Sequence, residues 1–502
     1  MSGTAQSPGR GPGTITTSVP ARLDRLPWSR WHWMIVIGLG TVWILDGLEV
    51  TVVGNIASRL SEDGSGLAIT DAQVTGLGAA LYVAGACCGA LFFGWLTDRF
   101  GRKKLFLVTL AVYLAATAMT ALSFTAWWFF LFRFLTGFGI GGEYAAINSA
   151  IDELIPSKYR GRVDLIINGS YWLGAMGGAL LSVLALNTDL LPKNIGWRLT
   201  FALGVVLGLV ILLVRRHVPE SPRWMFIHGR EEGAEQLLDD VERTVEQEKG
   251  ERLPEPGSSI TIEQRTSVGF WEIARTLFSS YPKRAVLGFA LFIGQAFLYN
   301  AITFGFSSIL VKFFAVSSGS TGYFFAVIAF GNFLGPLFLG KLFDTVGRRR
   351  MIAGTYVLSG ALLFVTAWFF AQGWLNATTM TACWCVVLFF ASAGASSAYL
   401  TVSEIFPMET RAMAIAFFYA IGTAAGGISG PLVFSALTSS GVVADAVLAF
   451  SIGAALMTAA GVVAAFLAID AEGKSLEDIA APLSARLGAQ GEKATPPAAP
   501  AG

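Results

Sequence analysis

The chain has 502 residues, of which 54% are hydrophobic and only 14% are charged. Soluble domains usually carry about 25% charged residues, so this composition excludes an ordinary soluble protein and indicates that lipid surrounds most of the chain. The net charge of +1 argues against a nucleic-acid partner.

The first part of the chain is rich in Gly, Pro, Ser and Thr and leads into a long apolar run without a small-residue cleavage site. We therefore predict that residues 1–30 form a disordered cytoplasmic tail and contain no secretory signal. The last part, residues 471–502, is predicted to be a second cytoplasmic tail.

Apolar runs that can cross about 30 Å of hydrocarbon as helices recur along the rest of the chain. They cover residues 33–57, 74–97, 104–123, 126–150, 162–186, 197–214, 285–310, 321–343, 351–372, 378–402, 412–438 and 444–468. The polar segment 217–284 divides them into two sets, and its stretch from Glu231 to Lys249 is typical of a solvated helix. The sequence predicts an all-α membrane protein of twelve transmembrane helices in two six-helix bundles, 31–216 and 285–470, joined by a cytoplasmic linker with surface helices.

The distribution of Lys and Arg predicts the orientation. With the N-terminus inside, the outward loops carry only Arg59, Lys193 and Lys312, whereas the inward segments are rich in basic residues. Cytoplasmic loops carry such an excess in membrane proteins. We expect a multi-pass protein of the inner or plasma membrane with both termini in the cytoplasm.

Two loop motifs occur twice, once in each half. Gly94-Trp-Leu-Thr-Asp98-Arg99-Phe-Gly101-Arg102 returns as Gly340-Lys-Leu-Phe-Asp344-Thr-Val-Gly347-Arg348, and Glu153-Leu-Ile-Pro-Ser-Lys-Tyr-Arg160 returns as Glu404-Ile-Phe-Pro-Met-Glu-Thr-Arg411. Duplicated halves are typical of transporters that rock about a site at the membrane midplane.

Each repeated loop places an acid at a helix end and basic residues just beyond it. We predict that these groups form ion pairs that close the cytoplasmic side and break when the protein changes state. The alternative is that the basic residues only set the topology. The predicted cytoplasmic gate comprises Asp98, Arg99, Gly101, Arg102, Glu153, Arg160, Asp344, Gly347, Arg348, Glu404 and Arg411.

Four ionisable residues, Asp46, Glu49, Arg133 and Glu143, fall inside predicted spans. An ionised group at the bilayer centre costs about 2.5–3.5 kcal/mol on insertion scales, so these residues need a function or a partner. At about 1.5 Å per residue, Glu49 and Arg133 lie at similar depths, and Asp46 shares a helix face with Glu49. A carboxyl group that moves between an Arg neighbour and a drier site changes its proton affinity, which predicts proton coupling by these four residues. A structural ion pair is the alternative, and Glu143 could instead bridge to the backbone of a neighbouring helix.

The chain offers no nucleotide-binding glycine loop and no nucleophile–base pair, and its four cysteines, Cys87, Cys88, Cys383 and Cys385, lie in apolar runs. We therefore expect neither an enzyme nor a metal site nor a bound cofactor. Tyr144, Tyr171, Trp172 and Tyr299 are expected to serve in helix packing or at the membrane interface.

The repeated loops resemble the G-x-x-x-D-R-x-G-R-R/K signature of the major facilitator superfamily. Pro219-Glu-Ser-Pro-Arg223 and the segment Glu472-Gly-Lys-Ser-Leu-Glu477 resemble motifs of its sugar-porter-related branch. Asp46-Gly-Leu-Glu49 resembles the D-G-x-D/E of organic-metabolite proton symporters, and Gly141-Gly-Glu-Tyr144 resembles the G-G-E-Y of metabolite, phosphate and synaptic-vesicle-glycoprotein-like members.

The resemblance implies roles for particular residues. Gln295 and Asn300 keep the Q-x-x-x-x-N spacing of sugar-binding residues, Asn332 matches a further binding Asn, and Tyr399 stands where sugar porters have Trp. Glu49 and Arg133 take the places of the Asp and Arg of proton-coupled sugar symporters.

The resemblance as a whole implies a monomeric, proton-driven symporter of a small polar organic solute, with an organic acid or related metabolite ahead of a sugar. A sugar symporter or uniporter is the nearest alternative. A sensor built on a transporter fold belongs to a different class, which a large added soluble domain would indicate.

Overall fold

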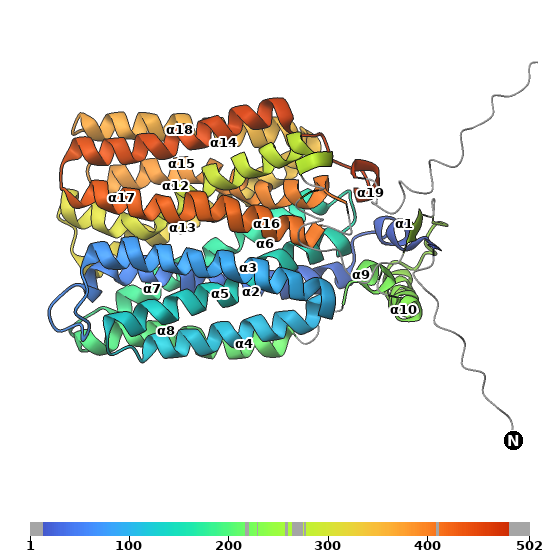
Figure 1. Ribbon diagram of the computed structural model, residues 1–502, viewed down its shortest axis with the longest axis horizontal. Helices are drawn as coiled ribbons and strands as arrows, with labels where there is room; N and C mark the ends of the chain where they lie inside the picture. The colour runs from blue at the N-terminus through green and yellow to red at the C-terminus, as the bar shows by residue number, and fades with distance from the viewer. Residues whose placement is uncertain are drawn as a thin grey trace, which may run out of the picture.

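The structure, a computed structural model, describes residues 14–215, 220–227, 229–256, 260–263, 275, 278–407 and 411–480. Long helices run side by side through most of it (Figure 1). The elements are β1 Thr14–Thr17, α1 Val19–Asp24, α2 Arg30–Leu60, η1 Gln73–Gly78, α3 Ala79–Phe100, α4 Arg102–Ala121, α5 Ala126–Leu154, α6 Arg160–Gly169, α7 Tyr171–Ala185, α8 Lys193–Arg215, α9 Pro222–Ile227, α10 Glu231–Lys249, β2 Ile260–Glu263, α12 Pro282–Phe314, η2 Ser318–Ser320, α13 Thr321–Thr345, α14 Arg348–Ala371, α15 Ala377–Ile405, α16 Arg411–Thr423, η3 Ala424–Ile428, α17 Ser429–Ser439, α18 Val443–Leu467 and α19 Leu476–Ile479.

Ten helical stretches within the described residues are long and apolar enough to cross a membrane. The predicted fourth and fifth spans are also helical, but they are not among these ten. The fourth, α5, carries Arg133 and Glu143. The fifth is divided into α6 and α7 at Ser170, whose hydroxyl donates to the carbonyls of Ile167 at 2.6 Å and Gly40 at 3.1 Å. The charged residues of α5 and the division of the fifth span therefore explain why ten long apolar helices are found where twelve spans are predicted.

The helices pack in two groups that follow the two halves of the chain (Figure 1). Glycines allow their backbones to touch: a Cβ on Gly141 of α5 would lie 1.8 Å from the Ala86 carbonyl oxygen of α3, and a Cβ on Gly47 of α2 would lie 1.8 Å from the Tyr171 carbonyl oxygen of α7. Such close approach by small residues stabilises helix pairs in lipid. The two groups meet where α2 packs on α12, α3 on α16 and α7 on α13.

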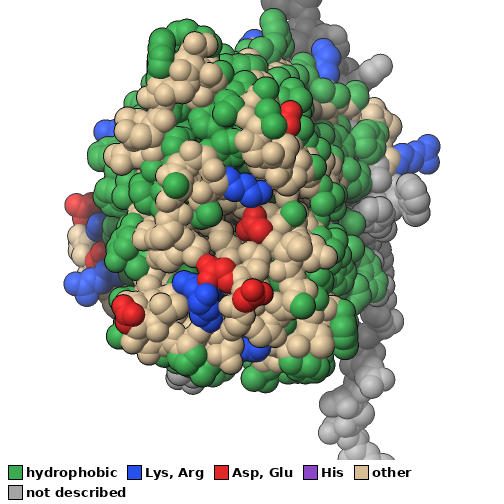
Figure 2. Space-filling model, turned by 90° about the vertical axis from the view of Figure 1, so that its left-hand side faces the viewer, with side chains coloured by type: hydrophobic (Ala, Val, Ile, Leu, Met, Phe, Trp, Pro, Cys, Tyr) green, Lys and Arg blue, Asp and Glu red, His purple; other side chains and the backbone are tan. Residues whose placement is uncertain are grey.

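The two ends of the bundle differ. We call the end that carries α1, α9, α10 and α19 the linker end and the opposite end the far end (Figure 1). Between them, large apolar side chains such as Phe338 and Phe466 are exposed, by 64% and 75%. An exposed apolar surface of this kind suits contact with lipid. Figure 2 views the far end, where acidic and basic side chains gather near the middle of the face.

The predicted disorder of residues 1–30 is wrong for the part from Thr14 onward, and residues 1–13 lie outside the described residues. Strand β1 pairs antiparallel with β2 of the linker, with Thr14 opposite Glu263. Arg22 donates to Glu242 of α10 at 2.9 and 2.7 Å, and Arg25 donates to the same carboxylate at 2.6 Å. These contacts join segments about 220 residues apart, which local composition cannot reveal. The strand pair also adds a small β element to the predicted all-α fold.

The predicted surface helix of the linker is confirmed by α10. Its side chains Ala234, Leu238, Val241 and Val245 are buried along one face, as helical spacing requires. Burial alone would raise the pKa of Glu242 on this helix, but the hydrogen bonds from Arg22 and Arg25 and their charges outweigh it and hold the pKa below its usual range. The carboxylate therefore stays ionised and holds the N-terminal segment on the linker.

Candidate functional site

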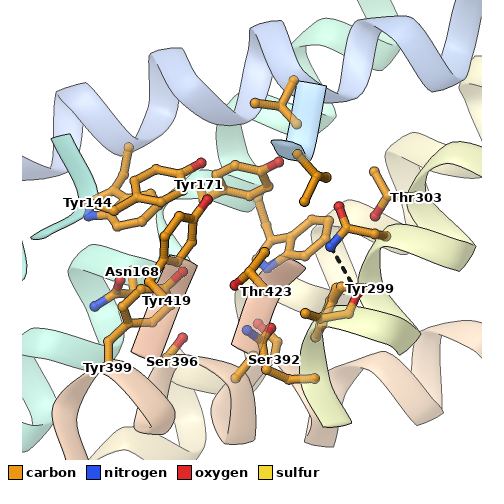
Figure 3. Close-up of a pocket in the computed structure, with 18 of the residues that line it drawn as sticks. Tyr144, Asn168, Tyr171, Tyr299, Thr303, Ser392, Ser396, Tyr399, Tyr419 and Thr423 are labelled. Carbon is orange, nitrogen blue, oxygen red and sulfur yellow. Dashed lines mark hydrogen bonds between the residues drawn. The ribbon is translucent and has the colours of Figure 1, made fainter. Parts of the chain in front are cut away.

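A cavity of about 140 Å³ lies between the two halves, near the middle of the helices (Figure 3). Both halves contribute to its wall. It is lined by Trp43, Val50, Tyr82, Val83, Tyr144, Asn168, Tyr171, Trp172, Gln295, Ala296, Tyr299, Asn300, Thr303, Phe304, Ser392, Ala395, Ser396, Tyr399, Tyr419 and Thr423.

Aromatic rings form much of this wall (Figure 3). Trp43 stacks on Tyr144 with ring centroids 4.6 Å apart, and Tyr144 meets the edge of Tyr419 at 5.0 Å. On the other side, Trp172 lies 5.3 Å from Tyr299. Every residue in the lining is uncharged, and amides and hydroxyls supply its polar groups. Such a cavity can hold a flat apolar body and bind polar substituents at its rim by hydrogen bonds.

Three of the four predicted solute-binding residues, Gln295, Asn300 and Tyr399, line the cavity. The fourth, Asn332, does not. Its amide oxygen accepts a hydrogen bond from the Tyr299 hydroxyl at 3.0 Å, and its amide nitrogen donates to the Ile328 carbonyl at 3.1 Å. Asn332 therefore positions Tyr299 from behind the cavity wall.

Tyr144, Tyr171, Trp172 and Tyr299, which were expected to serve in packing or at the membrane interface, all line the cavity and also pack against other aromatic rings. The sequence reasoning also missed Trp43, Tyr82, Asn168, Tyr419 and Thr423. Trp43 lies one helical turn before Asp46, and Thr423 directly precedes the π-helical turn η3. Such π-helical turns often mark functional positions, but their presence could not be read from the sequence.

Glu49 of α2 and Arg133 of α5 meet as expected. Arg133 Nη1 donates to Glu49 Oε1 at 2.8 Å, and both side chains are fully buried. The Thr117 hydroxyl lies 3.4 Å from the same oxygen. The guanidinium also lies over the ring of Tyr82, 4.7 Å from its centroid. Glu49 and Arg133 are not in the cavity lining, but Tyr82 and Val50 are, so a single side chain separates the pair from the cavity.

Asp46 and Glu143 are both buried. The Thr109 hydroxyl donates to Glu143 at 3.3 Å, which connects α4 and α5. The charges of Asp46, Glu49 and Glu143 all act on Tyr113 of α4. The three acids therefore lie in the same region of the first half.

At the linker end, an ion pair and a hydrogen bond join the two halves. Arg160 lies 3.8 Å from Glu404, and the backbone N–H of Arg162 donates to Asp344 at 2.8 Å. Arg348 holds both acids in place, since it contacts Asp344 at 2.8 Å and Glu404 at 3.1 Å. This is the kind of cluster that the repeated motifs predict.

Other predicted gate residues lie at the same end with different contacts. Glu153 is buried, and Arg411 Nε donates to the Ser403 carbonyl at 2.7 Å within its own half. Gly101 and Gly347 both have positive φ, 91° and 113°, where residues with a Cβ are strained. The side chains of Asp98, Arg99 and Arg102 lie outside the described residues.

Two acids from the other motifs take equivalent places in the two halves. Glu220 accepts a hydrogen bond from the backbone N–H of Lys103 at 3.2 Å, and Glu472 accepts one from that of Arg348 at 3.2 Å. Each carboxylate therefore sits at the start of a helix, α4 or α14, where negative charge is stabilised by the helix dipole.

Contacts at the far end also join the two halves, and nothing in the sequence indicated them. Glu62 accepts hydrogen bonds from Ser318 at 2.7 Å and from Lys193 at 3.0 Å, and Ser308 donates to Asp71 at 2.6 Å. Burial alone would raise the pKa of Glu62, but these hydrogen bonds and the charges of Arg59 and Lys193 lower it overall. In this structure the cavity lies between two ends that are both tied by contacts between the halves.

Residues 30–482 match the family described as "Sugar (and other) transporter". The chain is 27% identical to the niacin transporter NiaP of Acinetobacter baylyi, over 91% of this chain and 99% of that one. It is 28% identical to the 4-hydroxybenzoate transporter PcaK of the same organism, over 80% of this chain and 84% of that one. Among solved structures, the proton:xylose symporter XylE bound to 6-bromo-6-deoxy-D-glucose has a TM-score of 0.71 at 18% identity, covering 89% of this chain and 98% of XylE. The likeness to XylE shows the major facilitator fold.

Proposed function

The chain belongs to the Sugar (and other) transporter family and is a membrane transporter, and we propose that it couples the uptake of a small polar organic solute to protons by alternating access. In this proposal twelve helices span the inner or plasma membrane, and the linker end and both termini lie in the cytoplasm. The protein works as a monomer without a cofactor, and the proton gradient drives it. The larger number of basic residues toward the linker end supports this orientation.

The observation that carries the proposal is the fully buried pair of Glu49 and Arg133, 2.8 Å apart, one side chain from the cavity. Separating a buried ion pair and leaving one charge uncompensated costs about 3–5 kcal/mol. A proton on Glu49 removes most of this cost because the carboxyl group becomes neutral. Separation of the pair is therefore linked to proton binding, and a solute that favours separation favours proton uptake.

In this proposal the contacts at the two ends of the bundle open and close in turn. Opening to the outside requires the far-end contacts of Glu62 and Asp71 to break, and opening to the inside requires the contacts of Arg160 and Asp344 across the linker end to break. The far-end set consists of two hydrogen bonds, and the linker-end set consists of one buried ion pair and one hydrogen bond. Transport then proceeds when one set breaks while the other holds.

For the solute we propose an organic acid with a flat ring. The similarity to transporters named for niacin and 4-hydroxybenzoate supports it, and so does the aromatic lining around Trp43, Tyr144 and Tyr419. A sugar is the second candidate. It is favoured by Gln295 and Asn300, whose amides line the cavity at the spacing of sugar-binding residues.

Uptake into proteoliposomes tests both the proton coupling and the class of solute. Radiolabelled niacin, 4-hydroxybenzoate and xylose are supplied outside, with and without an inward-directed proton gradient. We expect the wild-type protein to accumulate one of the two aromatic acids, and to do so only with the gradient. The Glu49→Gln variant should retain counterflow of that solute and lose the response to the gradient.

Glu232→Gln is the matched control, because Glu232 is exposed on α10 far from the cavity. This variant should transport as the wild type does. Full proton-driven accumulation by Glu49→Gln would refute the coupling role. Accumulation of xylose in place of the acids would select the sugar alternative.

A further inference from the structure

Tyr82 of α3 is in contact with both parts of the site. It lines the cavity, and its ring lies under the guanidinium of Arg133, 4.7 Å from ring centroid to Cζ. Among the described residues that line the cavity, no other has a ring contact of this kind with Arg133. Phe201 also meets the guanidinium, at 5.9 Å, but lies outside the lining.

The backbone fixes the position of Tyr82. A Cβ on Gly137 would lie 2.0 Å from the Tyr82 carbonyl oxygen, so α3 and α5 touch at this residue. Gly137 lies four residues after Arg133, one helical turn along α5. The contact between the helices therefore brings the backbone of Tyr82 to the part of α5 that carries Arg133.

Both groups have hydrogen-bonding capacity left over. The Tyr82 hydroxyl is fully buried and has no hydrogen-bond partner in the described structure, and the same holds for Arg133 Nε and Nη2 and for Glu49 Oε2. A buried polar group without a partner is costly, so a solute that hydrogen-bonds the Tyr82 hydroxyl would be favoured. The single hydrogen bond between Arg133 and Glu49 can break without disrupting a larger network.

Other groups near the pair cannot carry a signal from the cavity as directly. Glu49 contacts Arg133 of α5 and Thr117 of α4. Its charge also acts on Tyr82 of α3, Tyr113 of α4 and Tyr171 of α7, and Asp46 lies on its own helix. Tyr113 and Thr117 do not line the cavity, and Tyr171 has no ring contact with Arg133. Tyr82 alone in this set combines a place in the lining with a ring under the cation.

We propose that Tyr82 is the positioning residue that transmits solute binding to the proton site. Its hydroxyl binds the solute, and its ring holds the Arg133 guanidinium when the Glu49 carboxyl accepts a proton and releases it. The cation–π contact is already present while the ion pair is formed, and it remains to stabilise the guanidinium when the pair separates. Solute binding and protonation of Glu49 then favour each other, and by linkage each changes the affinity for the other by the same factor.

Two variants test the roles of the Tyr82 hydroxyl and of its ring. Tyr82→Phe keeps the ring but removes the hydroxyl that binds the solute, so it should both weaken solute binding and reduce the dependence of solute affinity on pH. Tyr82→Leu removes the ring and should reduce that pH dependence by roughly 2- to 30-fold, the range expected for one cation–π contact. Counterflow, which needs no net proton movement, should persist in both variants.

Tyr419→Leu is the matched control. Tyr419 lines the same cavity and contacts Tyr144 and Tyr399, and no ring contact joins it to Arg133. This variant should bind solute more weakly and keep the wild-type pH dependence. Binding is measured on the purified full-length protein with niacin, 4-hydroxybenzoate and xylose at a series of pH values.

The inference rests on the proposed proton coupling, and the outcomes distinguish the two. A wild-type affinity that is independent of pH would contradict the coupling itself. A pH-dependent wild type together with an equally pH-dependent Tyr82→Leu would overturn the role of Tyr82 alone. A wild-type pH dependence in Tyr82→Phe would also overturn it, and this test holds even if the Leu variant does not fold.

Discussion

Asp344 offers a direct test of the linker-end closure. Its carboxylate accepts the backbone N–H of Arg162 across the two halves at 2.8 Å and pairs with Arg348 at 2.8 Å. A hydrogen bond to a charged group contributes about 1.5–3 kcal/mol. Asp344→Ala removes it, so the population open at the linker end should rise by about 10- to 150-fold. Asp344→Asn keeps an oxygen that can accept the N–H and should have a smaller effect.

The assay measures the rate at which a cysteine in the cavity reacts with a membrane-impermeant maleimide. Ser396→Cys supplies the reporter, since Ser396 lines the cavity, and the four free cysteines are first replaced by serine. In inside-out vesicles, Asp344→Ala should accelerate labelling by about 10- to 150-fold. Asp240→Ala, on the exposed face of α10, should not. Equal rates with and without Asp344→Ala would refute the assignment of this contact to the gate.

Two further predictions concern the far end and helix packing. Glu62→Gln weakens the contact with Ser318 and should speed labelling from the outside by about 10-fold, measured in right-side-out vesicles. Because the folded-state pKa of Glu62 lies below its ordinary value of 4.5, the contact is complete above that value and is lost only as pH falls through the lower folded pKa. Maleimide reacts with the thiolate, whose fraction falls with pH, so the labelling rate is divided by that of a fully exposed cysteine at the same pH. The wild-type ratio should thus be constant from about pH 8 to about pH 5, and a change in that window would contradict the contact. Gly141→Ala places a Cβ 1.8 Å from the Ala86 carbonyl oxygen and should lower Tm by several degrees or prevent folding, whereas Gly177→Ala, with nothing within 4 Å, should leave Tm unchanged.

The helices could be predicted because lipid imposes a strong constraint: each span must be long and apolar. The predicted ranges therefore agree with helices such as α12 and α18 to within a few residues. The Glu49–Arg133 pair could be predicted for a related reason, since charges inside such runs need partners. The division of the fifth span at Ser170, where the hydroxyl donates to Gly40 of another helix, was not predicted, because contacts between helices cannot be read from an apolar run.

The cavity wall was harder to predict. Tyr and Trp suit lipid interfaces, helix packing and binding sites equally well, and only the three-dimensional arrangement brings Trp43, Tyr144 and Tyr419 around one space. The far-end contact of Glu62 with Ser318 joins loops that carry no repeated motif. Asn332 matched a binding position by its place in the sequence, but its amide is used to hold Tyr299.

The central claim is that Glu49 takes up a proton when solute binds. It is tested most directly by counting the protons absorbed when the accumulated solute is added to purified protein in weakly buffered solution. We predict net proton uptake by the wild type, and little or none by Glu49→Gln, while both proteins still bind the solute. Equal proton uptake by the two proteins, or none by the wild type, would contradict the account.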